Sequence, residues 1–394
     1  MDTYEIIIVG AGPAGCAAAL ELHQRDPDLA KSVLLLDKAV FPRPKLCAGA
    51  VSADGQLALE RLGINFDIPS IPVHVTKFVF PAGCLTFQQL NQFRIIRREQ
   101  FDHHLFLAAR DRGVVARDGE AVENVIRTRD EVLVQTSKGE YRTKVLIAAD
   151  GANSIARAKL GLGRVGRVMI GMEVIVPLAA VSIQRFLEHM IHLYFEPLNH
   201  GAPGYCWVFP AVSGGPPLVS LGIMAAPFGR DEVTPVRAVF ANWLNGLGMD
   251  LDSLELKAHP ALRYEPRATC SQRRVLFVGD AAGVEPLFGE GIASAIIMGT
   301  LAAQNAYEAI RRNDFSFADY ERQIRSSLIG SMMRRRHMVA RRIYSKPKLA
   351  RHLLRHRIFL KGIALLSPPR AGTKITWETA DKELMRLQSG DGKG

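Results

Sequence analysis

Short apolar runs recur along the chain, and each ends in a turn rich in glycine or aspartate. The first run, Tyr4–Val9, leads into the glycine-rich segment Gly10–Gly15 and then into the helix-forming segment Cys16–Leu22. A second run, Val33–Leu36, ends in Asp37. This order of strand, tight turn, helix and strand predicts the opening β-α-β unit of a doubly wound α/β nucleotide-binding domain.

Two later apolar runs, Val145–Ala149 and Val275–Val278, also end at Asp/Gly turns, so the nucleotide-binding domain is expected to be discontinuous. Between them, runs separated by Pro/Gly turns predict an antiparallel sheet as the substrate lobe. The expected division is a Rossmann-like domain of residues 1–65, 96–165 and 260–330; an inserted β-sheet domain of 66–95 and 166–259; a basic helical C-terminal region of 331–388; and a disordered tail of 389–394.

The pattern Gly10-x-Gly12-x-x-Gly15 is typical of a dinucleotide site. Its glycines allow a tight turn, a close approach to a pyrophosphate and close packing of the next helix, whose N-terminus favours negative charge. Asp37 stands 22 residues beyond Gly15, where a carboxylate can accept hydrogen bonds from ribose hydroxyls. This context makes a dinucleotide site the favoured interpretation over a plain glycine-rich turn.

A second glycine-rich segment indicates which dinucleotide binds. After the strand Val275–Val278 come Asp280, a loop, and Gly289-Glu290-Gly291 at the start of a long helix. Asp280 suits the ribityl chain of a flavin, and the helix N-terminus can stabilise negative charge on the reduced ring. A simple NAD dehydrogenase has no use for this second loop, so the expected cofactor is FAD.

The net charge of +11 is concentrated near the C-terminus. Between Glu321 and Glu378 there are no acidic residues but fifteen Lys and Arg. Over residues 334–366 these charges alternate with apolar positions at near-helical spacing, which predicts one or two basic amphipathic helices. They suit either an anionic membrane surface or a solvated cap on the substrate lobe. Few aromatic residues lie among these charged residues, which argues against nucleic-acid binding.

The five cysteines are scattered without a Cys-x-x-Cys pair, which excludes a dithiol redox centre and fits a reducing compartment. No stretch reads as a signal peptide or a membrane span. We therefore expect a cytoplasmic protein, either free or peripheral on the cytoplasmic face of a membrane. The histidine pairs lack carboxylate or cysteine partners at ligand spacing, so no metal site is predicted.

Several motifs together resemble the p-hydroxybenzoate hydroxylase superfamily of FAD-dependent oxidoreductases, and within it the geranylgeranyl reductase group. Besides the glycine segments, they are Arg98 with Phe101-Asp102, and Asp150-Gly151. Lys45-Leu-Cys47-Ala-Gly-Ala is similar to the K-x-C-G-G-G loop of that group, with alanine at two of its glycines. Tyr205-x-Trp207-x-Phe209-Pro210 is similar to its Y-x-W-x-F-P element.

The resemblance implies a reaction and roles. Hydride passes from reduced FAD to one carbon of an isoprenoid C=C bond, and a proton goes to the other carbon. Cys47, Tyr205 and Trp207 are the candidate catalytic residues, and Cys47, Tyr205 or a held water is the candidate proton donor. Tyr205, Trp207 and Phe209 are the candidate walls of a hydrophobic substrate pocket. The expected cofactor-binding residues are Gly10, Gly12, Gly15, Asp37, Lys45, Arg98, Asp150, Gly151, Asp280, Gly289, Glu290 and Gly291.

Two other functions stay open. One is a flavin monooxygenase or halogenase acting on a hydrophobic or aromatic substrate; halogenases carry W-x-W-x-I-P where this chain has Tyr205 and Phe209, which favours the reductase. The other is a membrane-associated flavoprotein with a stress-response or interaction role. A separate Rossmann domain for NADPH is not predicted, so electrons are expected from transiently bound NADPH or from a ferredoxin-type carrier docked on the basic surface.

Overall fold

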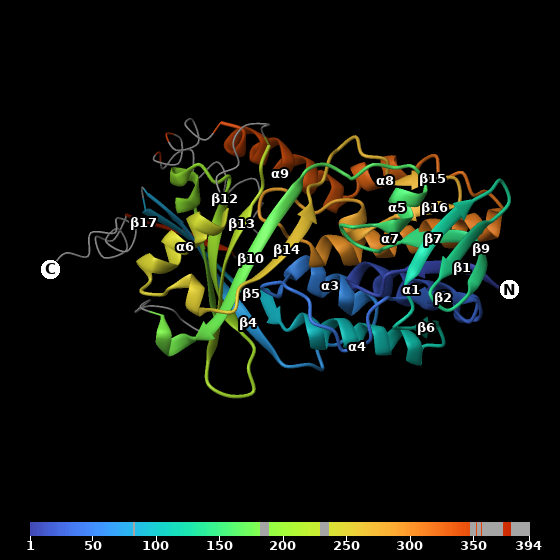
Figure 1. Ribbon diagram of the computed structural model, residues 1–394, viewed down its shortest axis with the longest axis horizontal. Coiled ribbons are helices and arrows are strands. Elements are labelled where there is room, and N and C mark those ends of the chain that lie inside the picture. Colours follow the sequence, from blue (N-terminus) through green and yellow to red (C-terminus); the bar gives the residue numbers. More distant parts are fainter. Residues whose placement is uncertain are drawn as a thin grey trace.

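The computed structural model describes residues 1–81, 83–181, 189–228, 236–346, 352, 356 and 373–379. Two mixed β-sheets lie side by side along the long axis of the molecule, and helices fill the region between and around them (Figure 1). The fold is of the α/β class that the apolar runs predict.

The first sheet has a parallel centre. β1 pairs in parallel with both β2 and β9, and β16 adds in parallel to β9. These central strands are nearly continuous apolar runs because helices cover them, as in other doubly wound sheets. The strand order is β15 (Ser271–Gln272), β16 (Val275–Phe277), β9 (Glu140–Ala148), β1 (Asp2–Val9), β2 (Val33–Leu36) and β6 (Val115–Arg117), with β7 (Val122–Arg127) and β8 (Val132–Thr136) joined to β9.

Two helices of this domain, α1 (Pro13–Arg25) and α7 (Ile292–Arg312), pack tightly against each other. A Cβ placed on Gly299 would lie only 2.1 Å from the carbonyl oxygen of Ala14, so small residues set this approach. Both helices begin at the edge where the parallel strands end. The other helices are α2 (Pro27–Ala30), α3 (Ala53–Arg61), α4 (Arg98–Asp111), α5 (Ile155–Lys159) and α8 (Tyr320–Ser326), and the short 3-10 turn Gly279–Ala281 follows β16.

The second sheet is antiparallel except where β11 pairs with β4. Its order is β14 (Lys257–Leu262), β10 (Val168–Pro177), β13 (Leu218–Ala225), β12 (Gly204–Ala211), β11 (Met190–Tyr194), β4 (Ser70–Phe80), β5 (Gly83–Ile96) and β17 (Lys374–Thr379), with β3 (Ala50–Ser52) also on β5. One face packs on α6 (Val236–Gly246) through a hydrophobic cluster. The other face carries the aromatic residues of β12 and its neighbours. Short 3-10 turns at Leu178–Ala180, Glu196–His200 and Leu251–Ser253 join these strands.

The C-terminal region contains both a helix and a strand. α9 (Leu328–Tyr344) is helical as predicted, and the buried residues Ala340, Ile343 and Tyr344 at its end pack on the second sheet. β17, by contrast, is a strand within the region 331–388 expected to be helical. Its alternating sequence Lys-Ile-Thr-Trp-Glu-Thr suits a strand, and the outer edge of β5 offers unpaired backbone groups. Most of 347–366 and all of the predicted tail lie outside the described residues.

The predicted domain boundaries stay a prediction. One short strand, β3, belongs to the second sheet although it falls within residues 1–65. Within the described part of the chain, every helix is too short or too polar to pass through a bilayer.

Candidate functional site

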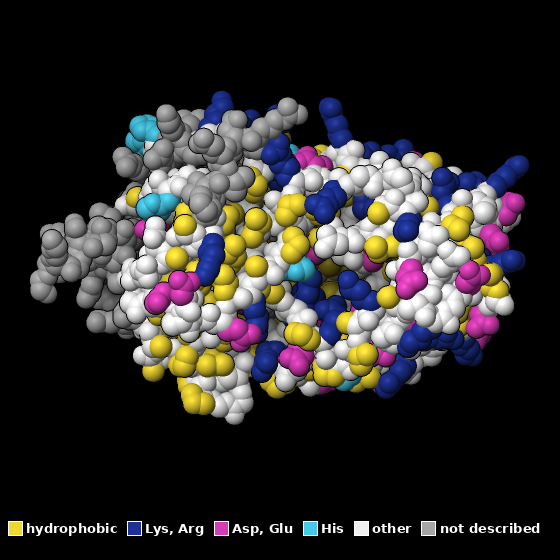
Figure 2. Space-filling model, in the orientation of Figure 1, with side chains coloured by type: hydrophobic (Ala, Val, Ile, Leu, Met, Phe, Trp, Pro, Cys, Tyr) yellow, Lys and Arg dark blue, Asp and Glu magenta, His cyan; other side chains and the backbone are white. Residues whose placement is uncertain are grey.

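A cavity of about 1110 Å³ extends from the glycine loop after β1 to the aromatic face of the second sheet. The molecular surface is hollowed near the middle of the face shown in Figure 2, where Lys and Arg side chains gather. We call the part lined by the first sheet's loops the cofactor half, and the part lined by Phe78, Phe195, Tyr205, Trp207 and Phe209 the aromatic half. All the predicted site residues line this cavity except Gly15.

Gly10 and Gly15 shape the loop beneath the cavity. Gly10 has a φ of +98°, and a Cβ there would lie 2.3 Å from the carbonyl oxygen of Ala149. A Cβ on Gly15 would lie 1.9 Å from the carbonyl oxygen of Gly10, so this glycine acts by packing and not by facing a ligand. The first turn of α1, which starts after Gly12, has no capping side chain among the described residues, so its N–H groups stay available to an anion.

Asp37 ties the end of β2 to this loop. Its Oδ2 accepts a hydrogen bond of 2.8 Å from the backbone N–H of Ala11, and its Oδ1 accepts one of 2.9 Å from Ala39. Each carboxylate oxygen has two lone pairs, so these bonds leave acceptor capacity toward the cavity. The structure therefore gives Asp37 a role in fixing the loop, and the predicted contact with ribose stays a prediction.

A buried aspartate orients two arginines at the cofactor half. Arg98 makes a bidentate pair with Asp102, with both N···O distances 2.8 Å, and Arg43 Nη2 lies 3.2 Å from the same carboxylate. Burial opposes the charge of Arg98, but the ion pair with Asp102 outweighs it and raises the pKa of Arg98. Arg43 Nη2 also lies 3.7 Å from the place of a Cβ on Gly12. The two guanidinium groups therefore supply fixed positive charge beside the helix N-terminus.

Lys45 and His259 form a second polar pair on the cavity wall. Lys45 Nζ lies 2.5 Å from His259 Nε2, in a geometry that lets the ammonium donate to a neutral imidazole. Burial, with the charge of Lys45 adding to it, lowers the pKa of His259 to about 4. Burial also lowers the pKa of Lys45, and the carboxylate of Asp280 opposes this shift. The pair therefore carries one positive charge, which Asp280 partly balances.

Cys47 and Asp150 line the cavity between its two halves. The Cys47 sulfur accepts a long contact of 3.4 Å from the N–H of Gly49 and lies beside the guanidinium of Arg98. Asp150 Oδ2 accepts a hydrogen bond of 3.0 Å from the N–H of Ala156. Burial raises the pKa of Asp150, with hydrogen bonds from Ser154 and backbone groups opposing the shift. Gly151, next to it, leaves open space toward the cavity.

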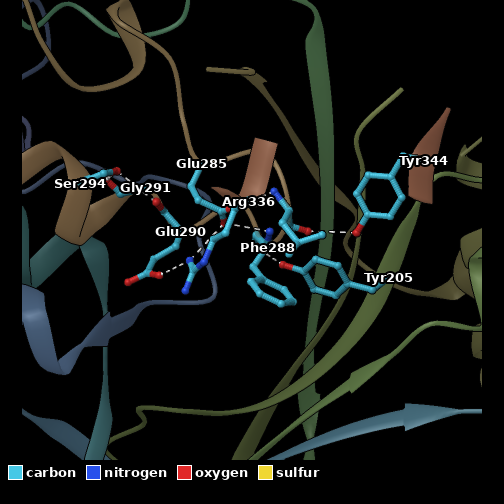
Figure 3. Close-up of polar contacts among 9 residues, drawn as sticks. Tyr205, Glu285, Phe288, Glu290, Gly291, Ser294, Arg336 and Tyr344 are labelled. Atoms are coloured by element: carbon cyan, nitrogen blue, oxygen red, sulfur yellow. Dashed lines mark hydrogen bonds and ion pairs between the residues drawn. The ribbon is translucent and has the colours of Figure 1, made fainter. Parts of the chain in front are cut away.

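The second glycine loop is held by one buried and one partly buried acidic residue and by one arginine. Glu285 accepts hydrogen bonds from the N–H groups of Leu287 (2.6 Å) and Phe288 (2.8 Å). Arg336 of α9 lies between Glu285 (3.5 Å) and Glu290 (2.8 Å), as Figure 3 shows. The arginine thus fixes the loop that leads into α7, whose first turn has no capping side chain among the described residues.

Aromatic rings line one face of β12. The centroids of Tyr205 and Trp207 are 6.4 Å apart, as are those of Trp207 and Phe209. The Tyr205 hydroxyl donates to the carbonyl oxygen of Phe288, which joins the wall to the second glycine loop (Figure 3). The Trp207 indole lies over Gly222, where a Cβ would come within 2.0 Å of its ring. The aromatic wall that the alternation predicts is therefore continuous and rests directly on the sheet.

Sequence reasoning did not single out four groups that the fold brings to this cavity: Arg43, His259, Glu173 and Arg336. For Glu173 a signal existed, because a lone carboxylate interrupts the apolar run of β10. Arg336 stands in a row of three arginines, and nothing in the sequence separates the buried one from its neighbours. His259 and Arg43 lie in segments without a motif.

The cavity fits FAD. Two helix N-termini without capping side chains, at Gly12 and Gly291, line the same space, and the Arg43–Arg98 pair supplies charge for a pyrophosphate. The glycine loop leaves room where side chains would clash. This combination defines an FAD-dependent oxidoreductase whose cavity is also lined by a second sheet.

Comparison with known proteins agrees with this class. The family model described as "FAD binding domain" matches residues 3–335, and the chain belongs to that family. It is 28% identical over 341 residues to the digeranylgeranylglycerophospholipid reductase of Methanocaldococcus jannaschii, covering 82% of each chain.

Two solved structures share the fold. A geranylgeranyl bacteriochlorophyll reductase-like protein from Thermoplasma acidophilum superposes with a TM-score of 0.72 at 20% identity, covering 98% of this chain and 96% of that one. The flavin-dependent halogenase CmlS superposes with a TM-score of 0.66 at 21% identity, covering 86% of this chain and 64% of that one. The chain is thus an FAD-dependent oxidoreductase, and it is similar in sequence to a protein named as a digeranylgeranylglycerophospholipid reductase.

Proposed function

We propose that this protein reduces C=C bonds of a hydrophobic isoprenoid or lipid substrate. The observation that carries the proposal is the single cavity that joins the cofactor half to a wall of five aromatic side chains. At about 1110 Å³ the cavity exceeds the roughly 300–1,000 Å³ of most ligand pockets, which suits a cofactor and a substrate together. The similarity to a named lipid reductase supports the same substrate class.

FAD supplies the hydride chemistry when it is bound and reduced. The residues proposed to hold it are Gly10, Gly12 and the first turn of α1, the guanidinium of Arg98 with Arg43, and Asp37, Lys45, Asp150, Gly151, Asp280 and Gly289-Glu290-Gly291. Gly15 contributes by allowing α1 to pack close to the loop.

The aromatic half is proposed to bind and orient the substrate. Tyr205, Trp207 and Phe209 present a continuous apolar surface beside Cys47, and burying an alkyl chain there excludes water from the reacting carbon atoms. An unactivated alkene accepts hydride poorly, so the protein must also hold a proton donor close to it. Cys47 and Tyr205 are the residues proposed from the motifs for the reacting end of the pocket.

The basic C-terminal region is proposed to meet an anionic membrane or an acidic electron carrier. On α9, Arg335, Arg341 and Arg342 are exposed, and so are Leu328 and Met338. This mixture of charged and apolar groups suits the headgroup region of a bilayer. Vesicle flotation of the intact protein and of an Arg335→Glu/Arg341→Glu/Arg342→Glu variant tests this: equal flotation argues against the membrane role. NADPH or a ferredoxin-type protein is the proposed reductant.

A flavin monooxygenase or halogenase is the second candidate, because the fold is shared with a flavin-dependent halogenase. One experiment separates the two. The FAD-loaded protein is reduced anaerobically with dithionite and mixed with a geranylgeranylated lipid, while flavin absorbance and product mass are followed. Reoxidation without O₂ and a gain of two hydrogens per bond supports the reductase. Flavin that stays reduced until O₂ enters, with oxygen or halide gained by the product, supports the second candidate.

A further inference from the structure

Glu173 is a buried carboxyl group in the aromatic half of the cavity. It lies on β10, its residue is 4% exposed, and it lines the cavity together with Trp207 and Ser220. The Trp207 indole N–H donates to the Ser220 hydroxyl at 2.9 Å, and that hydroxyl donates to Glu173 Oε1 at 2.5 Å. The carboxyl group is therefore fixed at one end of the indole.

The sheet register explains this placement. Trp207 on β12 is paired with Gly222 on β13, and Gly222 is paired with Glu173 on β10. Because Gly222 has no side chain, the indole extends across β13 toward the carboxyl group. An apolar chain lying on the indole therefore has the carboxyl of Glu173, with the Ser220 hydroxyl bound to it, at the edge of its surface.

The net effect of the surroundings on the pKa of Glu173 is upward. Burial raises the pKa of Glu173, while the Ser220 hydroxyl, the Lys257 ammonium and the backbone N–H of Cys47 oppose the shift. The hydroxyl of Tyr205, by contrast, already donates to the carbonyl of Phe288 (Figure 3), and burial raises its pKa further. Tyr205 thus serves better to hold the second glycine loop than to release a proton.

We propose that Glu173 is the general acid of this cavity, a role that rests on the proposed reductase function. Its carboxyl O–H bond breaks and a C–H bond forms at one alkene carbon, while the other carbon receives hydride from the reduced cofactor. The π bond breaks, the alkene is reduced by two electrons and the cofactor is oxidised. The carboxylate regains a proton from solvent on the side of Lys257, which is its register partner on β14 and is half exposed.

The test uses the FAD-loaded protein and two substitutions. Glu173→Gln keeps the shape of the side chain and an acceptor for the Ser220 hydroxyl, but it has no acidic proton. Glu173→Asp restores the carboxylic acid on a side chain that is shorter by one methylene group. In anaerobic single turnover with a geranylgeranylated lipid, we expect Glu173→Gln to slow flavin reoxidation by about 10²–10⁴-fold, the usual range for general acid catalysis. Glu173→Asp should recover part of that loss. FAD content and affinity for the saturated lipid should not change.

A substrate-free measurement supplies an independent readout. Infrared spectra of the wild type at neutral pH should contain the carbonyl stretch of a protonated carboxylic acid, and Glu173→Gln should lose it. Glu196→Gln is the matched control, because Glu196 is also shielded, and burial raises its pKa, but it lies away from the cavity lining. Its reoxidation rate should equal that of the wild type.

The outcomes separate the two proposals. A wild-type rate in Glu173→Gln, or an infrared spectrum in which the Glu173 carboxyl is ionised, overturns the acid role alone. If the lipid fails to reoxidise the wild-type flavin, the reductase function fails and the acid role fails with it.

Discussion

In the cofactor half of the cavity the inward-facing groups are backbone N–H groups and paired charges, whereas in the aromatic half they are rings carried by alternate residues of neighbouring strands. The first half depends on loop backbone that only glycine permits at Gly10, and on charges fixed by Asp102. The second depends on ring packing over Gly222. Binding a dinucleotide thus requires a fixed backbone, and enclosing an apolar chain requires a fixed surface.

A single added methyl group in the cofactor half should abolish FAD binding. In Gly10→Ala the new Cβ would meet the Ala149 carbonyl at 2.3 Å, on a backbone with φ of +98°. We expect loss of bound FAD and a fall in the free energy of unfolding by more than about 4 kcal/mol. Flavin absorbance and thermal unfolding measure both. Gly161→Ala is the control, since its φ of +72° is similar but its Cβ meets open space, and it should lose only about 1–2 kcal/mol and keep FAD.

The next largest loss of stability is expected at Arg336, which holds the second glycine loop between the two halves. Arg336→Met leaves the buried carboxyl group of Glu285 and the partly buried one of Glu290 without their cation. Breaking such a pair costs about 3–5 kcal/mol, so the urea midpoint should fall clearly. Arg335→Met, one residue earlier on the exposed side of α9, should leave the midpoint almost unchanged. Equal midpoints for the two variants would contradict this view of α9.

A change confined to the aromatic half should leave the cofactor in place. Gly222→Ala puts a methyl group into the Trp207 ring, at 2.0 Å, and forces the indole off the sheet. Overpacking of this kind costs about 1–3 kcal/mol. We expect normal FAD content, altered tryptophan fluorescence and weaker lipid binding. Gly215→Ala, in the β12–β13 connection with open space around it, should change none of the three.

The smallest expected effect is a pH dependence from the cofactor half. Burial and Lys45 lower the pKa of His259 from 6.5 to about 4 in the folded protein. Between these values the unfolded chain binds more protons, so stability is present above pH 6.5 and falls as the pH decreases toward 4. His259→Gln should reduce the stability lost between pH 6.5 and pH 4 by about 1 kcal/mol, given the partial exposure of the ring. Urea unfolding of the FAD-loaded protein at several pH values measures the slope, and identical slopes would argue against the shifted histidine.

The two halves also differ in how far the sequence predicts them. Each of the two glycine loops, at Gly10 and at Gly289, is one continuous stretch of sequence. Because each loop acts through its backbone, the spacing of its glycines is enough to predict it. The partners of Glu173 are on β12 and β13. Their alignment depends on the register between strands, which a local sequence pattern does not predict. The same holds for Arg336, whose carboxyl partners lie about fifty positions earlier. Alternation did predict the ring wall of β12, because period two is a local property.

The pairing of β17 with β5 has a consequence for how the chain reaches its final form. β3 pairs with β5 over Phe93–Ile95, and β17 pairs with β5 over Gly83–Gln88. Two short strands thus cover different parts of the same edge of β5. During synthesis β3 is made before β5, but residues 374–379 emerge only after nearly three hundred more. Throughout that interval an apolar strand edge stays open to other nascent chains. The unpaired edge at Gly83–Gln88 should therefore be the segment through which nascent chains aggregate or bind chaperones.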